Sequence, residues 1–129
     1  MRVLAGEARW RLLIPAGSQM RINRGFDPIG PDEQDDFAFD FGPLLTAFGI
    51  APETIASTAW VCSVSEGSAA ADASAATRLI GSPSIVGTLS VQRIGTMVTG
   101  VSYTLEATIV TALSGRALSL CAGIDCKSC

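Results

Sequence analysis

The sequence contains no histidine at all. Histidine is the base of the Ser-His-Asp and Cys-His mechanisms, the usual proton carrier near neutral pH and a common ligand of zinc. Its absence excludes the most common hydrolase mechanisms and every zinc site built on imidazole. We therefore expect a protein that is not an enzyme and that carries no cofactor.

Charged residues and long apolar runs are also scarce. Charged side chains make up 16% of the 129 residues and apolar ones 48%; soluble domains usually carry about 25% charged residues. A chain of this length normally forms one domain. Because it carries so few charged side chains, we expect part of its surface to be buried in an assembly. The best early apolar run, 12–16, contains Pro15 and is too short to span a membrane. Because Glu7, Arg9 and Arg11 interrupt any signal-peptide core, we expect synthesis in a cytoplasm.

Charge is unevenly distributed along the first 40 residues. Residues 1–24 hold five arginines and one glutamate, whereas residues 25–40 hold six acids and no base. The net charge of −3 lacks the basic excess that phosphate binding needs, so neither nucleic acid nor membrane is an expected partner. The two segments could pair with each other or with a neighbouring copy, or they could be two solvated segments.

Residues 1–26 are predicted to form a basic N-terminal arm or hairpin. Apolar residues alternate with arginine along 9–14, and a second alternation follows the turn sequence at 15–18. Tryptophan and arginine together are typical of protein interfaces, so we expect this arm to dock on another subunit and not in its own core. The interface candidates are Arg9, Trp10, Arg11, Leu12, Ile14 and Arg21.

Residues 27–121 are predicted to form an all-β, immunoglobulin-like sandwich. Apolar and polar side chains alternate in several short segments, most of which are bounded by Gly or Pro. This alternation predicts strands at 37–41, 54–65, 78–80, 84–86, 89–93, 97–99, 101–113 and 118–120. In segment 54–65, Ile55 and Trp60 differ in parity, which implies a bulge between them. In segment 101–113, Leu113 has the same parity as the residues expected to face the core. The low-complexity segment 66–76 could form a short Ala-rich helix, but Gly67, Ser68 and Ser74 favour a mobile loop. The core candidates are Phe37, Phe39, Phe41, Trp60, Cys62, Tyr103, Leu105 and Ile109.

Tyr103 carries a more specific signal. It lies just after Gly100, near the start of the penultimate predicted strand. This position matches the tyrosine corner of immunoglobulin-like sandwiches, in which the hydroxyl bonds to backbone across the corner. The alternative is an ordinary, partly buried tyrosine.

Five short motifs occur in order along the chain. They are Asp27-Pro28, the Asp-aromatic alternation at 36–41, the Ile-Ala-Ser-x-x-Trp of 55–60, the Gly-x-x-Tyr of 100–103 and the Ser-Gly-Arg of 114–116. Together they resemble the small immunoglobulin-like structural proteins of tailed bacteriophages, the fiber-tail adaptor or minor tail protein family. The family often has Gly-Gly where this chain has Ile94-Gly95. Neither the basic arm nor the cysteine tail belongs to the usual pattern.

The resemblance covers roughly residues 27–120 and implies a role as well as a fold. It implies a virion protein, made in the host cytoplasm, that forms a ring at the neck or tail and links the particle to fibers or collar. The implied partners are other virion proteins and copies of the chain itself. The alternatives are a capsid-surface decoration protein and a carbohydrate-binding or adhesin module. The acids grouped at 27–36 lie in a predicted loop, which lacks the rigid cleft of a glycosidase.

Four cysteines complete the candidate residues. Cys62 has inward parity and Cys121 outward parity, so a bridge between these two is disfavoured. Residues 122–129 are predicted to form a short Cys-rich tail. A Cys-x-x-Cys redox motif, a four-cysteine zinc site, plain thiols and disulfides are the possible chemistries. We favour at least one inter-subunit disulfide among Cys121, Cys126 and Cys129.

Overall fold

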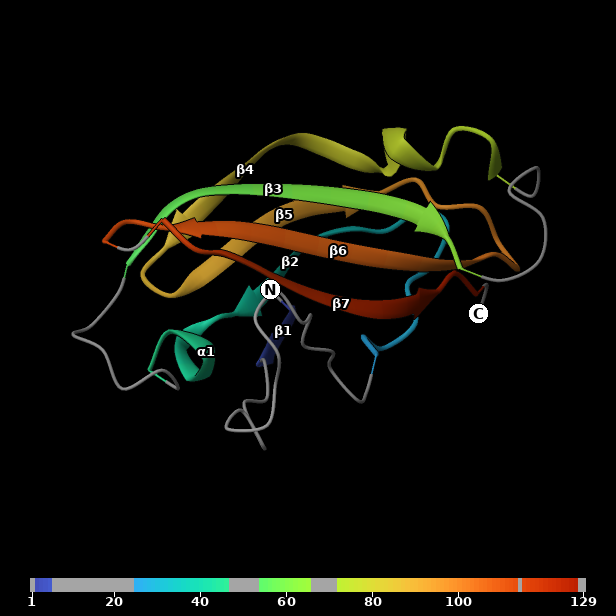
Figure 1. The fold of residues 1–129 in the computed structure, drawn as a ribbon. Helices are drawn as coiled ribbons and strands as arrows, with labels where there is room; N and C mark the ends of the chain where they lie inside the picture. Colours follow the sequence, from blue (N-terminus) through green and yellow to red (C-terminus); the bar gives the residue numbers. More distant parts are fainter. Residues whose placement is uncertain (1, 6–24, 47–53, 66–71, 114, 128–129) are drawn as a thin grey trace.

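Two β-sheets make up most of the structure, a computed structural model that describes residues 2–5, 25–46, 54–65, 72–113 and 115–127. The only helices among these residues are two short ones. In chain order the elements are β1 (Arg2–Ala5), β2 (Gln34–Asp40), the helix α1 (Gly42–Thr46), β3 (Ile55–Val64), the 3-10 helix η3 (Ala75–Arg78), β4 (Leu79–Val86), β5 (Leu89–Gly95), β6 (Ser102–Thr111) and β7 (Ala117–Asp125) (Figure 1). The predicted all-β class is confirmed.

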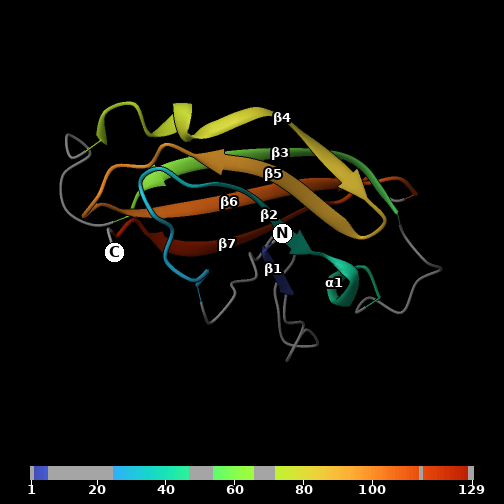
Figure 2. The ribbon, with the colours of Figure 1, turned by 180° about the vertical axis from the view of Figure 1, so that it is seen from behind.

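The strands divide between a four-stranded and a three-stranded sheet. The larger sheet has the order β1-β2-β5-β4 and the smaller one the order β3-β6-β7. All neighbours are antiparallel except β1 and β2, which are parallel. The smaller sheet faces the viewer in Figure 1 and lies behind the larger one in Figure 2. One core therefore forms between two layers.

Strict alternation explains β6, the central strand of the smaller sheet. Its odd-numbered residues from Tyr103 to Ile109 are buried, and its even-numbered ones from Ser102 to Thr108 are partly exposed. The side-chain period of a strand is two, so one face packs on the core and the other meets solvent. The strand ends at Thr111, so Leu113 falls in the following turn and is 68% exposed. Its predicted inward position is wrong because the alternation does not continue past the strand end.

β3 supplies the only tryptophan among the described residues. A register shift between Ile55 and Ser57 confirms the predicted bulge, and it puts Trp60 and Cys62 on the inner face. The Trp60 indole lies 5.1 Å from the ring of Phe39 in the opposite sheet, measured between centroids. Its N–H donates a hydrogen bond of 2.8 Å to Ser90 Oγ of β5. A buried indole thus has both an apolar and a polar partner across the sandwich.

The larger sheet contributes most of the aromatic core. Phe26 packs edge-on against Phe37, with ring centroids 4.9 Å apart, and contacts Phe39 at 5.5 Å. Edge-to-face packing is a favoured arrangement of aromatic rings. All eight sequence-derived core candidates are buried: Phe37, Phe39, Phe41, Trp60, Cys62, Tyr103, Leu105 and Ile109.

The N-terminal residues differ from the prediction of a separate arm. β1 pairs in parallel with β2, from Arg2 opposite Phe37 to Ala5 opposite Asp40, and the side chain of Leu4 is buried. Phe26, assigned to the arm, belongs to the core. An unpaired edge of β2 would expose backbone donors and acceptors, and β1 covers it. Residues 2–5 and Phe26 therefore belong to the folded domain, and the prediction that the arm stays out of its own core is wrong there.

Two predictions about the short strands also change. The segments 78–80 and 84–86 are one strand, β4, with a register shift between Ile80 and Ser84. Residues 97–99 are not a strand. After β5 the chain turns through Thr96, which has a φ of +56°, and leaves the sheet. Alternation over three residues cannot reveal such a turn.

The C-terminal strand is longer than expected. β7 runs to Asp125, so residues 122–125 belong to the sheet and not to a tail. Cys126 is fixed next: its N–H donates to Val101 O at 3.1 Å and its carbonyl accepts from the Gly100 N–H at 2.8 Å. The predicted tail 122–129 is wrong over these residues because their backbone groups are paired.

Candidate functional site

The most strongly coupled polar cluster of the described residues joins Asp72, Arg78 and Tyr103. Asp72 precedes η3, Arg78 ends it, and Tyr103 lies at the start of β6. Arg78 holds the carboxylate with two hydrogen bonds, Nε to Oδ2 at 2.8 Å and Nη2 to Oδ1 at 3.0 Å. The paired donors match the planar carboxylate, which is the strongest geometry for such a pair.

Two further donors complete the coordination of this carboxylate. The Tyr103 hydroxyl donates to Asp72 Oδ2 at 2.6 Å, and the Ser74 N–H donates to Oδ1 at 3.0 Å. The Tyr103 oxygen accepts the N–H of Val98 at 3.0 Å. The hydroxyl contact to the backbone across the corner, predicted from the sequence, is present. The Asp72 side chain is only 3% exposed, and its four donors compensate for the loss of water.

Electrostatics fix the protonation of the cluster. The hydrogen bonds from Arg78 lower the pKa of Asp72 to about 2 against the opposing effect of burial, with further help from Tyr103 and Ser74. Burial raises the pKa of Tyr103 to about 12, and its hydrogen bond to Asp72 acts in the same direction. At neutral pH the carboxylate is charged and the hydroxyl keeps its proton. The cluster therefore holds η3 against the start of β6.

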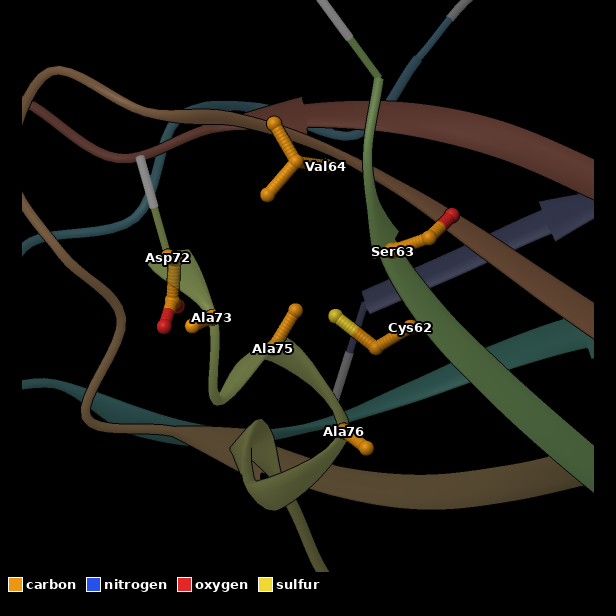
Figure 3. Close-up of a pocket in the computed structure, with 7 residues that line it drawn as sticks. All are labelled: Cys62, Ser63, Val64, Asp72, Ala73, Ala75 and Ala76. Atoms are coloured by element: carbon orange, nitrogen blue, oxygen red, sulfur yellow. The ribbon is translucent and has the colours of Figure 1, made fainter. Parts of the chain in front are cut away.

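A cavity of about 420 Å³ lies beside this cluster, between the end of β3 and η3. Figure 3 shows the Cys62 sulfur pointing toward Ala75, another of the residues that line the cavity. Burial raises the pKa of the Cys62 thiol to about 12, with the Asp72 charge as a second cause. A protonated thiol is a poor nucleophile. The residues lining the cavity are Cys62, Ser63, Val64, Asp72, Ala73, Ala75 and Ala76.

Sequence reasoning missed this cluster. Residues 66–76 were predicted to be a mobile loop; 66–71 lie outside the described residues, but 72–76 lead into η3 and are anchored by Asp72. The only signal available was a lone carboxylate among Ala and Ser, six residues before Arg78. Its third partner, Tyr103, is far away in the sequence, so spacing alone could not reveal the contact.

The cysteine candidates have separate environments. Cys62, Cys121 and Cys126 are all free. Cys121 is half-buried and lies opposite Glu106, with the outward parity that the sequence predicted. Cys126 is 1% exposed, and burial raises the pKa of its thiol. It therefore cannot reach a neighbouring subunit as a tail residue would, whereas Cys129 lies outside the described residues.

The outer face of the smaller sheet is a candidate interaction surface. Its side chains are small, and its charged members, Glu106 and Asp125, are both acidic. No arginine or lysine of the described strands joins this face. Its residues are Ser57, Ala59, Val61 and Ser63 of β3, Ser102, Thr104, Glu106, Thr108 and Val110 of β6, and Ala117, Ser119, Cys121, Gly123 and Asp125 of β7.

The predicted arm interface cannot be placed on this surface directly. Arg9, Trp10, Arg11, Leu12, Ile14 and Arg21 all lie outside the described residues. Within the described ranges, no three metal-binding side chains come together. Nor does any helix found there have the length and apolar character needed to cross a bilayer.

The chain matches no protein-family model, no curated protein and no solved structure.

Proposed function

We propose that this chain is an immunoglobulin-like sandwich. Its sheets, β1-β2-β5-β4 and β3-β6-β7, match in strand number and order the ABED and CFG sheets of constant-type immunoglobulin domains. Trp60 on β3 takes the place of the buried tryptophan of strand C, and Tyr103 on β6 that of the corner tyrosine of strand F. The parallel pairing of β1 with β2 departs from that arrangement.

In function, the chain is a non-enzymatic structural protein of a tailed bacteriophage virion. It forms a ring at the neck or tail and links the particle to fibers or collar. The observation that carries this role is the outer face of the smaller sheet, which has small side chains and only acidic charges. Surfaces with few charges suit contact between subunits, because few charged groups lose their hydration when the surface is buried. The five phage-like motifs of the sequence point the same way.

Particles released from a host that carries the gene provide the test. Mass spectrometry of purified particles should detect this chain, and antibody labelling in the electron microscope should place it at the neck or tail. Absence of the chain from particles would contradict the proposal. Label over the capsid would favour decoration, and binding of the purified chain to glycans would favour an adhesin.

A pair of arginine substitutions tests whether the outer face of the smaller sheet forms the contact between subunits. Ala59→Arg places a long charged side chain on the outer face of the smaller sheet, and Ser84→Arg places one on the exposed part of β4 in the other sheet. Both positions are exposed, so both variants should fold. Ala59→Arg should abolish ring formation in native mass spectrometry while Ser84→Arg preserves it. Equal behaviour of the two variants would exclude this face as the contact.

We also propose that Cys121 or Cys129 forms a disulfide with a neighbouring subunit after assembly. Cys121 is only partly buried on the outer face, whereas Cys62 and Cys126 are buried. Particles denatured without reductant, after thiol blocking, should yield multimers or adducts that collapse to the 13.3 kDa chain on reduction. The double substitution Cys121→Ser and Cys129→Ser should abolish them, and Cys126→Ser should not. Monomer under both conditions would refute the bridge.

A further inference from the structure

β4 is an edge strand whose side chains are mostly exposed. It ends the strand order β1-β2-β5-β4, so β5 is its neighbour among the described strands of that sheet. Its sequence, Leu79–Val86, contains no charged residue. The side chain of Ile85 is 39% exposed and that of Val86 is 58% exposed. An exposed, uncharged edge strand with β-branched residues is the kind of strand to which another copy of a chain can add.

A bulge interrupts this strand. Residues 81–83 of β4 lie opposite a single residue of β5, Gln92, because the register shifts there. Gly81 has a φ of +73°, a left-handed conformation that favours glycine, and Pro83 has no N–H to donate to a ladder. A bulge bends and twists its strand, and proline removes a donor from the edge. Both features therefore hinder the addition of a further strand.

The side chain of Gln92 is bonded to the backbone at this bulge. Its Nε2 donates to Ile80 O at 3.0 Å, to Gly81 O at 3.1 Å and to Arg93 O at 3.0 Å. All three partners are carbonyl oxygens, so only the nitrogen end of the amide fits there. Gln92 is 2% exposed, and a buried amide is costly to leave unpaired. The amide therefore supplies a donor to two carbonyls of β4 at the point where the regular ladder is interrupted.

We infer that Gln92 is a positioning residue that keeps β4 bulged, and that the bulge prevents a second copy of the chain from adding to this edge. Hydrophobic alternation alone does not fix the bulge, because three residues against one is an excess of two, and a shift by two residues keeps every side chain on its own face. In a regular ladder the side chain of Gln92 would stand perpendicular to the sheet, away from the carbonyls of β4. Its three hydrogen bonds therefore favour the bulged register. This role of Gln92 is independent of whether the chain belongs to a virion.

Gln92→Met tests the role of the amide. Methionine is unbranched and similar in size, so it keeps the core filled and removes the hydrogen-bonding groups. Analytical ultracentrifugation of the full chain over a range of concentrations measures the result. We expect the fraction of chain in large, open-ended aggregates to rise on the order of tenfold above that of the unsubstituted chain. Equal sedimentation of the two chains would overturn the inference.

Matched lysine substitutions show where the association occurs. In the Gln92→Met chain, Val86→Lys puts a charge on the exposed part of β4 and should restore the sedimentation of the unsubstituted chain. Val3→Lys puts the same charge on β1, at the other end of the strand order of the same sheet, and should not restore it. Aggregation that both lysines suppress, or that neither suppresses, would overturn the inference, because it would reflect unfolding or a contact elsewhere.

A shortened chain tests the bulge without changing Gln92. Deleting Ser82 and Pro83 removes the two extra residues and leaves every other side chain of β4 on its own face, so the domain should still fold. This chain should aggregate as Gln92→Met does, and Val86→Lys should restore it in the same way. A shortened chain that stays dispersed would overturn the protective role of the bulge, whatever the behaviour of Gln92→Met.

Discussion

Tyr103 joins three parts of the chain that are separate in sequence. Its ring is completely buried, and its hydroxyl links the Asp72 carboxylate before η3 to the Val98 N–H after β5. One oxygen therefore acts as a donor to one segment and as an acceptor for another. The connection fixes the end of the sandwich where β3, η3 and β6 meet.

Removing this hydroxyl should destabilise the fold. Tyr103→Phe keeps the ring but leaves the Val98 N–H without its partner and takes one of two donors from Asp72 Oδ2, which keeps Arg78 Nε. An unsatisfied buried group costs about 1–3 kcal/mol. We expect a loss of about 2 kcal/mol in the free energy of unfolding, measured by urea denaturation. Thr104→Val, the neighbouring outward position, should change it by less than about 0.5 kcal/mol. Equal losses in both variants would contradict the role given to the hydroxyl.

The lowered pKa of Asp72 predicts that the free energy of unfolding falls at acid pH. Its pKa is lowered from the ordinary 3.8 to about 2, so the folded state favours the charged carboxylate. The resulting stabilisation is complete above the unfolded pKa and is lost as the pH falls through about 4 toward 2, by roughly 2 kcal/mol. Melting temperature against pH should show this decline, and Asp72→Asn should flatten it.

The exposed pair of Asp36 and Arg93 provides the control for that experiment. The Arg93 side chain is 54% exposed and that of Asp36 39%, and such pairs contribute little. Asp36→Asn should therefore leave the acid limb of the stability profile nearly unchanged. A stability profile that changes with Asp36→Asn and not with Asp72→Asn would assign the loss of stability at acid pH to Asp36 and contradict the prediction for Asp72.

At the scale of elements, β3 is the strand that connects the two sheets most directly. Trp60 packs on Phe39 of β2 and bonds to Ser90 of β5, while its own strand pairs with β6. The neighbouring side chain, Val61, points outward and is 55% exposed. The two adjacent positions of β3 thus belong to the core and to the outer face.

This contrast gives a matched pair of substitutions. Trp60→Ala removes a large buried ring and should cost about 3–5 kcal/mol of unfolding free energy. Val61→Ala should cost less than about 0.5 kcal/mol. Chemical denaturation of the two variants checks both values. A tolerant Trp60 would show that the two sheets do not share the core described above.

The sequence predicts the long strands well and the small or distant features poorly. Alternation over ten residues identified β3 and β6, and opposite parity located the bulge before Trp60. β1 was missed because four residues are too few to show a period, and its burial depends on β2. The Asp72 cluster was missed because one of its members, Tyr103, lies on a strand far along the chain. Non-local contacts decide such features, and single-sequence patterns do not contain them.

For the whole molecule, the N-terminal region divides into parts with different roles. Residues 2–5 pair with β2 in the larger sheet, and 26–29 bond to β7 in the smaller one. The interface candidates between them, including Trp10, Leu12 and Ile14, are therefore connected at both ends to the folded domain. Deleting the entire N-terminal region would remove part of the fold together with the proposed interface.

Point substitutions can separate these two roles. Leu4→Ser places a hydroxyl in a buried site of β1 and should lower the free energy of unfolding by about 2 kcal/mol or more. The triple substitution of Trp10, Leu12 and Ile14 by Ser should preserve the unfolding free energy and abolish incorporation into particles. Denaturation and particle mass spectrometry measure the two effects. Normal incorporation of the triple variant would refute the docking of this segment on another subunit.

The strand order also has a consequence for folding kinetics. Among the described strands, β4 with β5 and β6 with β7 are hairpins between neighbours, but β2 must find β5 and β3 must find β6 across long intervening segments. Closing such loops costs entropy before any contact compensates for it, and all-β domains of this kind fold in milliseconds to seconds. We expect the hairpins to form early and the closure of the two sheets to limit the rate. Newly made chains would then become competent for assembly at the rate of that closure, and not at the rate at which subunits meet by diffusion.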